Sequence, residues 1–300
     1  MGSTDGAKKK KRWGDRSDGR WVRDVPGLQT VMTHLYYNRT DNEVYLNDTF
    51  DATALLEYLE KKNAEHPEYK TTVFHCLVTA VARMVKERPK LNRFIQGRRM
   101  YERDDISISF VAKRRFADNA EEALMQIFAK DDCTLDTISK KIIGDVTETR
   151  KSEHSTEGSI DAIIDWFAKI PRPILIPVMK LIRVCDFWGK NPKPFMDGNP
   201  NYATVLMSNL GSIKCPSVYH HLNNYGTNSV MITIGTIHKE EMVMPDGHKE
   251  IRDVVDLGAT LDERIADGFY FARSLKLIHY ILANPELLDK PLGEPSGFEY

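Results

Sequence analysis

Apolar residues recur along this chain at two spacings, and these spacings predict strands that alternate with helices. Residues 43–50 (EVYLNDTF) are predicted as a strand, and the D-A-T that follows is good capping chemistry for a helix over 54–63. Residues 71–87 repeat apolar side chains at the i, i+3, i+4 spacing of a helix that faces a core.

The middle of the chain predicts a hairpin followed by two more helices. Residues 93–102 (RFIQGRRMYE) and 105–114 form a hairpin-like unit, whose second half alternates isoleucine with serine, as a strand with one buried face does. Residues 120–128 and 135–149 are predicted as helices.

The last third of the chain returns to strand patterns. Residues 202–211 predict a strand that runs into a turn, and residues 229–237 (SVMITIGTI) and 251–260 predict two further strands. The P-D-G at 245–247 predicts a hairpin turn between strands. A helix over 267–282 completes the pattern.

Residues 159–189 depart from this alternation. Two apolar helical pieces flank a proline-rich corner at Pro171, Pro173 and Pro177. The stretch also holds four aromatic residues: Trp166, Phe167, Phe187 and Trp188. Two interpretations stay open, a helical hairpin packed on the domain, or a lid or lipid-facing insertion that contacts a membrane.

Composition and charge exclude several classes of protein. The 300 residues are 41% hydrophobic, enough for a sizeable core, and the formal net charge of −1 lacks the basic excess of a nucleic-acid-binding protein. No apolar run approaches the ~18 residues of a membrane span. The four cysteines show no C-x-x-C spacing, so we expect no metal site. Scattered cysteines and a polar N-terminus without a secretory signal predict a cytoplasmic protein.

The same patterns predict the organisation of the chain. Residues 1–29 contain K-K-K-K-R and are predicted as a flexible basic arm, either a solubilising tail or a contact for phosphate or membrane. Residues 30–290 are predicted as one domain, with the insertion at about 159–189, and residues 291–300 as a C-terminal tail.

Four segments, in order, resemble one family. They are FDATALLEYL, TTVFHCLVTAVARMVKERPKLNRFI, VLMSNLGSI and LDERIADGFYFARSLKLIHYILANPELL. These segments are similar to the catalytic domain of the 2-oxoacid dehydrogenase acyltransferases and to its relative chloramphenicol acetyltransferase. The third resembles the family's S-N-L-G segment, and the fourth its D-H-R-x-x-D-G motif.

The resemblance implies a fold, a reaction and an assembly. The fold is an α/β two-layer sandwich of a mixed sheet and helices, of the CoA-dependent acyltransferase (chloramphenicol acetyltransferase-like) type. The reaction is acyl transfer from a coenzyme A or carrier thioester to a thiol, hydroxyl or amine. Relatives are trimers with the active site between subunits, so we expect a homotrimer. No lipoyl-bearing or subunit-binding domain precedes residue 30, which implies a stand-alone member.

The resemblance also implies which residues act. Acyl transfer needs a base for the attacking group and a donor for the oxyanion. Matching the family's motifs places Ser208 in the donor position, next to Asn209, and Glu263 in the base position. Asp267 falls on the motif aspartate, where we expect a structural ion pair with Arg39.

The departure from the family is a glutamate where the motif histidine stands. Free imidazole titrates near pH ~6.5 and a free glutamate near ~4.3, so Glu263 would serve as a base only if burial raised its pKa toward neutrality. Loss of a general base forfeits ~10²–10⁴ in rate. His220 and His221, in the loop after Ser208, are candidates to substitute. The alternative is a catalytically inactive acyl- or CoA-binding member of the family.

Two other residues have structural interpretations. His75 is predicted to pack on the core helix. Cys215 follows the S-N-L-G turn and would act as a nucleophile only with a base or positive charge nearby.

Overall fold

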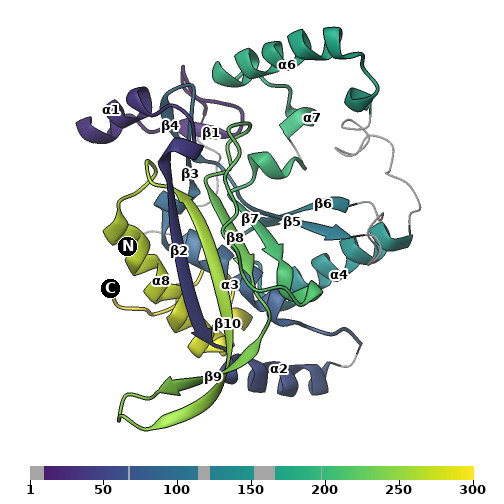
Figure 1. Ribbon diagram of the computed structural model, residues 1–300, viewed down its shortest axis with the longest axis vertical. Coiled ribbons are helices and arrows are strands. Elements are labelled where there is room, and N and C mark those ends of the chain that lie inside the picture. Colours follow the sequence, from purple (N-terminus) through teal and green to yellow (C-terminus); the bar gives the residue numbers. More distant parts are fainter. Residues whose placement is uncertain (1–9, 67, 114–121, 152–165, 197) are drawn as a thin grey trace.

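The computed structural model describes residues 10–66, 68–113, 122–151, 166–196 and 198–300. In this part of the chain a mixed sheet of seven strands forms the centre of the molecule (Figure 1). Its strands are β2 (Glu43–Asp51), β5 (Ile106–Lys113), β6 (Glu122–Ala129), β7 (Val205–Asn209), β8 (Val230–Ile234), β9 (His238–Val243) and β10 (Lys249–Asp262). The order is β2-β10-β8-β7-β5-β6, with β9 paired to the first residues of β10. β7 runs parallel to β5 and β8, and the other pairs are antiparallel.

Helices pack against this sheet and against one another. They are α2 (Thr53–Glu65), α3 (Val73–Glu87), α4 (Leu135–Lys151) and α8 (Gly268–Ala283). α3 contacts α2, α4, α8 and β5, so it lies in the middle of the helical layer. The expected two-layer α/β sandwich with a mixed sheet is confirmed.

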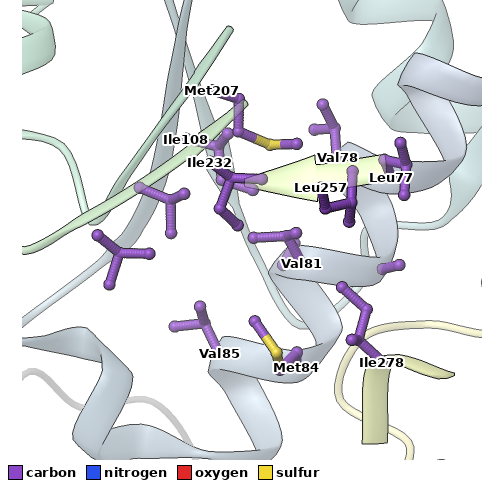
Figure 2. Close-up of a cluster of buried hydrophobic side chains, with 14 of the residues drawn as sticks. Leu77, Val78, Val81, Met84, Val85, Ile108, Met207, Ile232, Leu257 and Ile278 are labelled. Atoms are coloured by element: carbon purple, nitrogen blue, oxygen red, sulfur yellow. The ribbon is translucent and has the colours of Figure 1, made fainter. Parts of the chain in front are cut away.

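The core lies between α3 and the sheet. Figure 2 shows Leu77, Val78 and Val81 of α3 directed toward strand residues, and all three are fully buried. The strand side chains that meet them come from four strands: Ile108, Met207, Ile232 and Leu257. Full burial of each such side chain stabilises the fold by ~1.5–3 kcal/mol relative to exposure, so α3 is the main source of apolar burial.

The helix expected at 120–128 is wrong, since Glu122–Ala129 is the strand β6. Met125 and Ile127 are buried, whereas Phe128 is 42% exposed. This alternation has the period of a strand. β6 pairs antiparallel with β5, which would otherwise present an open edge there, and that pairing outweighs the helix propensity of Glu, Ala, Leu and Met.

A smaller sheet contains β1 (Gly19–Trp21), β4 (Arg99–Arg103) and β3 (Arg93–Gln96), in the order β1-β4-β3. β1 belongs to the segment expected to be a flexible arm, so that expectation is corrected for residues 10–29, while residues 1–9 lie outside the described ones. The Arg16 side chain is only 3% exposed, and its Nη2 lies 3.1 Å from Asp186 Oδ1. Helix α1 (Gly27–Leu35) follows at once.

The insertion contains a long helix that projects from the body of the molecule. α6 (Arg172–Phe187) extends beyond the sheet at the top of Figure 1, and α7 (Lys193–Met196) returns toward it. The proline corner differs from the expected one, because only Pro171 precedes α6, while Pro177 lies inside it. The first helical piece expected from residue 159 falls on 152–165, outside the described residues. α6 is held at its last turn, where Asp186 also accepts a hydrogen bond from Gln96 Nε2 at 2.7 Å.

The remaining expected elements are present. The hairpin turn at 245–247 joins β9 to β10, with Gly247 at a positive φ of 89°. The C-terminal segment packs on α3, where Arg83 donates to the carbonyl oxygens of Lys290 and Glu294. Short 3₁₀ helices are η1 (Thr40–Asn42), η2 (Pro89–Asn92), η3 (Pro200–Tyr202), η4 (Leu210–Ile213) and η5 (Pro285–Asp289). None of the helices in the described ranges is both long enough and apolar enough to span a bilayer.

Candidate active site

Glu263 lies in the turn between β10 and α8. Its N–H donates to the Asn42 carbonyl oxygen at 2.9 Å, which holds the turn against η1. The side chain is exposed. Among the residues that the structure describes, its carboxylate has no hydrogen-bond or ion-pair partner. The base position is therefore an open carboxylate on a fixed backbone.

A buried ion cluster flanks Glu263 in sequence. Asp262 is fully buried and receives two bonds from Arg264, Nη2 to Oδ2 at 2.6 Å and Nε to Oδ1 at 2.8 Å. Arg264 Nη1 also donates to the Tyr36 carbonyl oxygen at 2.8 Å, which ties the turn to the end of α1. Arg39 Nε lies 3.7 Å from Asp262 Oδ2. Two cations thus share one carboxylate beneath the turn that carries Glu263.

Arg39 pairs with Asp262 and not with Asp267, which corrects the expected ion pair. Its Nη2 donates to the carbonyl oxygens of Ile95 at 3.0 Å and Gly226 at 3.1 Å. Burial lowers the pKa of Arg39 to about 10, and the attraction of Asp262 opposes this shift. Arg39 therefore stays charged at neutral pH and joins three distant segments under the site.

Asp267 has a local structural role at the start of α8. Its Oδ1 accepts a hydrogen bond from the Tyr270 N–H at 2.8 Å, and its backbone is extended as an N-cap residue requires. The side chain is exposed. The motif aspartate thus satisfies one of the free N–H groups of the helix that follows Glu263.

Ser208 lies near the end of β7, where the backbone enters a tight turn. The next residue, Asn209, accepts a hydrogen bond from the Ser212 N–H at 3.3 Å and so caps η4. A Cβ on Gly211 would lie 2.5 Å from the Gly235 carbonyl oxygen. The turn after Ser208 therefore needs glycine for close approach to β8, which explains the N-L-G pattern physically.

Ser208 and Glu263 lie at opposite ends of the sheet in one chain. Ser208 is aligned with Thr233 of β8, and Thr233 with Gly258 of β10. Glu263 comes five residues after Gly258. At ~3.3 Å per residue, with two strand spacings of ~4.8 Å between, the two residues are on the order of 15–20 Å apart. A single chain does not bring them together.

A loop over 215–228 connects these two ends across the sheet. Thr233 Oγ1 accepts from the Val218 N–H at 3.2 Å, level with Ser208, and the Leu222 N–H donates to Glu43 at 2.5 Å. Glu43 is aligned with Asp262, so the loop reaches the Glu263 end there. His220 and His221 lie between Val218 and Leu222 in this loop. Both are exposed, and their ring centroids are 4.9 Å apart.

A pocket of about 290 Å³ opens beside the Glu263 turn. Its lining holds four arginines, Arg39, Arg98, Arg183 and Arg264, and one carboxylate, Asp186. Its lining is rich in guanidinium groups, so it favours an anionic group.

Comparison with known proteins identifies the family. The sequence model described as 2-oxoacid dehydrogenases acyltransferase (catalytic domain) matches residues 30–115 and 200–289. The chain belongs to this family. The matched ranges hold Arg39, Ser208, Glu263 and Asp267, while the insertion with α6 falls between them.

Solved structures of other acyltransferase cores share the fold. A probable dihydrolipoamide acetyltransferase from Listeria monocytogenes is 20% identical, with a TM-score of 0.58 over 87% of this chain and 93% of that one. The dihydrolipoamide acetyltransferase of Azotobacter vinelandii is 16% identical, with a TM-score of 0.58 over 90% and 94%. The cubic core of a pyruvate dehydrogenase multienzyme complex is also 16% identical, with a TM-score of 0.58 over 96% and 98%. A search among curated proteins found no match.

Two residues of the site were not predicted from the sequence. Asp262 and Arg264 stand on either side of Glu263 in the D-E-R of the motif, and this adjacency of opposite charges was the available signal.

His75 takes a structural role, since its Nδ1 accepts from the Thr72 N–H at 3.3 Å and burial lowers its pKa to about 4. In the described ranges no cluster of three His, Cys, Asp or Glu residues could hold a metal ion.

Proposed function

We propose that this protein transfers an acyl group from a coenzyme A or carrier thioester to a hydroxyl, thiol or amine. The observation that carries the proposal is the family match, which spans the segments of both Ser208 and Glu263. The acceptor oxygen, sulfur or nitrogen attacks the thioester carbonyl carbon, Glu263 takes the acceptor's proton, and the Ser208 hydroxyl donates to the oxyanion. The carbon–sulfur bond then breaks, and the leaving thiolate takes the proton from Glu263.

We propose further that the site forms between copies of the chain in a homotrimer. The distance between Ser208 and Glu263 within one chain supports this, because a donor and a base on one intermediate must lie within a few ångströms of it. One similar solved structure is the cubic core of a pyruvate dehydrogenase multienzyme complex. Ser208 of one copy would face Glu263 of the next. The exposed Glu263 carboxylate would then be shielded from bulk water at the interface, next to the reacting group.

Acyl-CoA profiling of variants tests the reaction. We expect release of free CoA to depend on acceptor, to fall about 10²-fold in Ser208→Ala, and to fall ~10²–10⁴-fold in Glu263→Gln. Asp246→Asn, on the exposed β9–β10 turn, is the matched control. Turnover that is unaffected by both substitutions contradicts the proposed roles.

Complementation between inactive variants tests the shared site. Ser208→Ala and Glu263→Gln subunits co-expressed in equal amounts would form trimers in which about a quarter of the interfaces pair an intact serine with an intact glutamate. We expect about that fraction of wild-type activity, whereas sites contained within one chain would give none.

The inactive alternative rests on the residue type at the base position. The study of the Azotobacter enzyme concerns a serine, a histidine and an asparagine in its catalytic mechanism, and this chain has a glutamate where the family motif has its histidine. An inactive member would bind acyl-CoA without turnover, and Glu263→Gln would leave its affinity unchanged. Activity gained by Glu263→His, from a wild type that has none, favours this alternative.

We also propose that α6 contacts an anionic membrane surface. Exposed apolar residues recur along one side of the helix at i, i+7 and i+14: Ile174 (56% exposed), Leu181 (62%) and Trp188 (69%). Residues 166–190 carry five basic residues against one acid, Asp186, which is buried. An apolar stripe flanked by cations is typical of interfacial helices.

Vesicle flotation tests this contact. We expect the protein to float with phosphatidylglycerol vesicles and not with phosphatidylcholine alone, and to lose flotation when Ile174 and Leu181 are both changed to Glu. Equal flotation of the variant and the wild type contradicts the proposal.

A further inference from the structure

A large cleft lies between the N-terminal segment, α1, the β3–β4 turn and the end of α6. Its volume is about 910 Å³, in the range of ligand sites. Most of its lining comes from residues 13–25 and 184–190, and neither range is matched by the family's sequence model. The cleft is thus built mostly by parts of this chain outside the matched ranges, while Arg98 and Arg99 lie within them.

The cleft carries an excess of positive charge. The guanidinium groups of Arg23 and Arg99 lie 4.4 and 4.2 Å from the centroid of the Trp21 ring, and Arg98 and Lys190 also face the cleft. In the described part of the chain, neither Arg23 nor Arg99 forms an ion pair with a carboxylate. Arg23 Nη2 also donates to the Trp13 carbonyl oxygen at 2.8 Å. Stacking on indole fixes a guanidinium plane while it leaves the remaining N–H groups at its edge able to bind an anion.

The one carboxylate in this lining, Asp15, accepts hydrogen bonds from backbone N–H groups. Asp15 Oδ1 accepts from the Trp21 N–H at 3.0 Å, and Oδ2 accepts from the Arg12 N–H at 2.8 Å. Asp15 therefore holds the N-terminal segment in place. It forms no ion pair with Arg23 or Arg99, but it attracts Arg23 electrostatically, so the positive charge in excess in this lining is that of Arg98, Arg99 and Lys190.

Part of the lining is apolar. Val184 and Phe187 at the end of α6, Trp188 just after it, and Val22 and Val25 from the N-terminal segment also line the cleft. Trp188 is 69% exposed and Phe187 40%. Exposed aromatic side chains beside guanidinium groups that have no carboxylate partner favour a ligand with an apolar body and an anionic end.

The cleft adjoins the pocket beside Glu263. Both are lined by Gly97, Arg98 and Phe187, which lie at the boundary between them. Gly97 has a φ of 57°, and a Cβ there would lie 2.2 Å from the Phe187 carbonyl oxygen. The β3–β4 turn thus packs directly on the end of α6, between the cleft and the pocket that Arg264 lines.

We propose that this cleft binds an amphipathic organic anion, with a carboxylate or phosphate on Arg23 and Arg99 and an apolar chain or ring against α6. Binding does not depend on the reaction. That the ligand is a substrate of acyl transfer, reaching Glu263 through the adjoining pocket, rests on the proposed function.

Isothermal titration with dodecyl phosphate below its critical micelle concentration tests the binding. We expect affinity to weaken about tenfold or more when Arg23 and Arg99 are both changed to Gln. Lys239→Gln with Lys249→Gln, on the remote β9–β10 hairpin, removes the same charge and should leave affinity unchanged. If the arginine variant fails to fold by circular dichroism, Lys190→Gln, on an exposed residue, serves in its place with a smaller expected loss. Equal affinity of wild type and folded cleft variants overturns the proposal.

Three other ligands separate the possible sources of binding. Inorganic phosphate and dodecanol should each bind at least about tenfold more weakly than dodecyl phosphate, because each lacks one half of the recognised chemistry. Equal binding of either one overturns the proposal. Binding to phosphatidylglycerol vesicles without binding to monomeric dodecyl phosphate also overturns it, and assigns these cations to the membrane surface.

The proposed cleft and the proposed acyl transfer can fail independently of each other. Dodecyl phosphate binding in a protein without acyl-CoA turnover supports the cleft and removes the proposed reaction. Turnover of acyl-CoA without dodecyl phosphate binding supports the reaction and overturns the proposed cleft ligand.

Discussion

Removal of the Asp262 carboxylate tests the ion cluster beneath the Glu263 turn. Asp262 is fully buried, and its Oδ2 lies 2.6 Å from Arg264 and 3.7 Å from Arg39. At an effective dielectric constant of ~20, each pair attracts on the order of 5 kcal/mol, most of which offsets the desolvation of three charges. Asp262→Asn keeps the shape but leaves two buried guanidinium groups without a counter-charge. We expect the free energy of unfolding to fall by about 3–5 kcal/mol.

Urea denaturation followed by tryptophan fluorescence measures this loss, with thermal denaturation as a second readout expected to shift by roughly 10 °C. Asp246→Asn is the matched control, because it neutralises an exposed carboxylate on the remote β9–β10 turn and should cost less than ~0.5 kcal/mol. Arg264→Met in the Asp262→Asn background removes one unpaired cation and should recover part of the loss. A loss below about 1 kcal/mol in Asp262→Asn would refute the reasoning, since the cluster would then contribute little to the fold.

Three further changes probe the scaffold of the site. Gly97→Ala places a side chain at positive φ against the Phe187 carbonyl oxygen. We therefore expect the free energy of unfolding to fall by about 2–3 kcal/mol and proteolysis within α6 to become faster. Equal stability of variant and wild type would contradict the close packing. Asp267→Ala removes the cap on the Tyr270 N–H and should cost about 1 kcal/mol in thermal denaturation, most of it recovered by Asp267→Ser. Burial lowers the pKa of His75 from 6.5 to about 4. As the pH falls, the unfolded state therefore binds a proton at this residue before the folded state does. The free energy of unfolding should fall as the pH drops from ~6.5 to ~4, by at most about 3 kcal/mol. Urea denaturation across this range should show a shallower slope in His75→Gln, and an unchanged slope would remove His75 as the cause.

The elements with one dominant period were predictable from the sequence. The apolar spacing of α3 predicts its buried face, and the S-N-L-G segment predicts the turn after Ser208. The strand β6 was mistaken for a helix because its residues favour helices locally, and only pairing with β5 shows otherwise. Local propensity is outweighed where an unpaired sheet edge needs a partner.

The candidate site was predictable in its motif residues and not in its contacts. Ser208, Glu263 and Asp267 are read directly from the motifs. The partner of Arg39 depends on the packing of residues more than two hundred positions apart in the sequence, and Asp262 took the place expected for Asp267. The cleft was missed for the same reason, since residues 13–25 and 184–190 meet only in the folded chain.

The contact between Arg16 and Asp186 has a consequence for synthesis of the chain. These residues lie 170 positions apart, and both are buried when paired. During translation at ~5–20 residues per second, the N-terminal segment waits roughly 10–30 s before its partner is made. Over that interval Arg16 and the neighbouring strand lack their final packing and are open to chaperones and proteases. The N-terminal segment therefore completes its packing only after residue 186 has been synthesised.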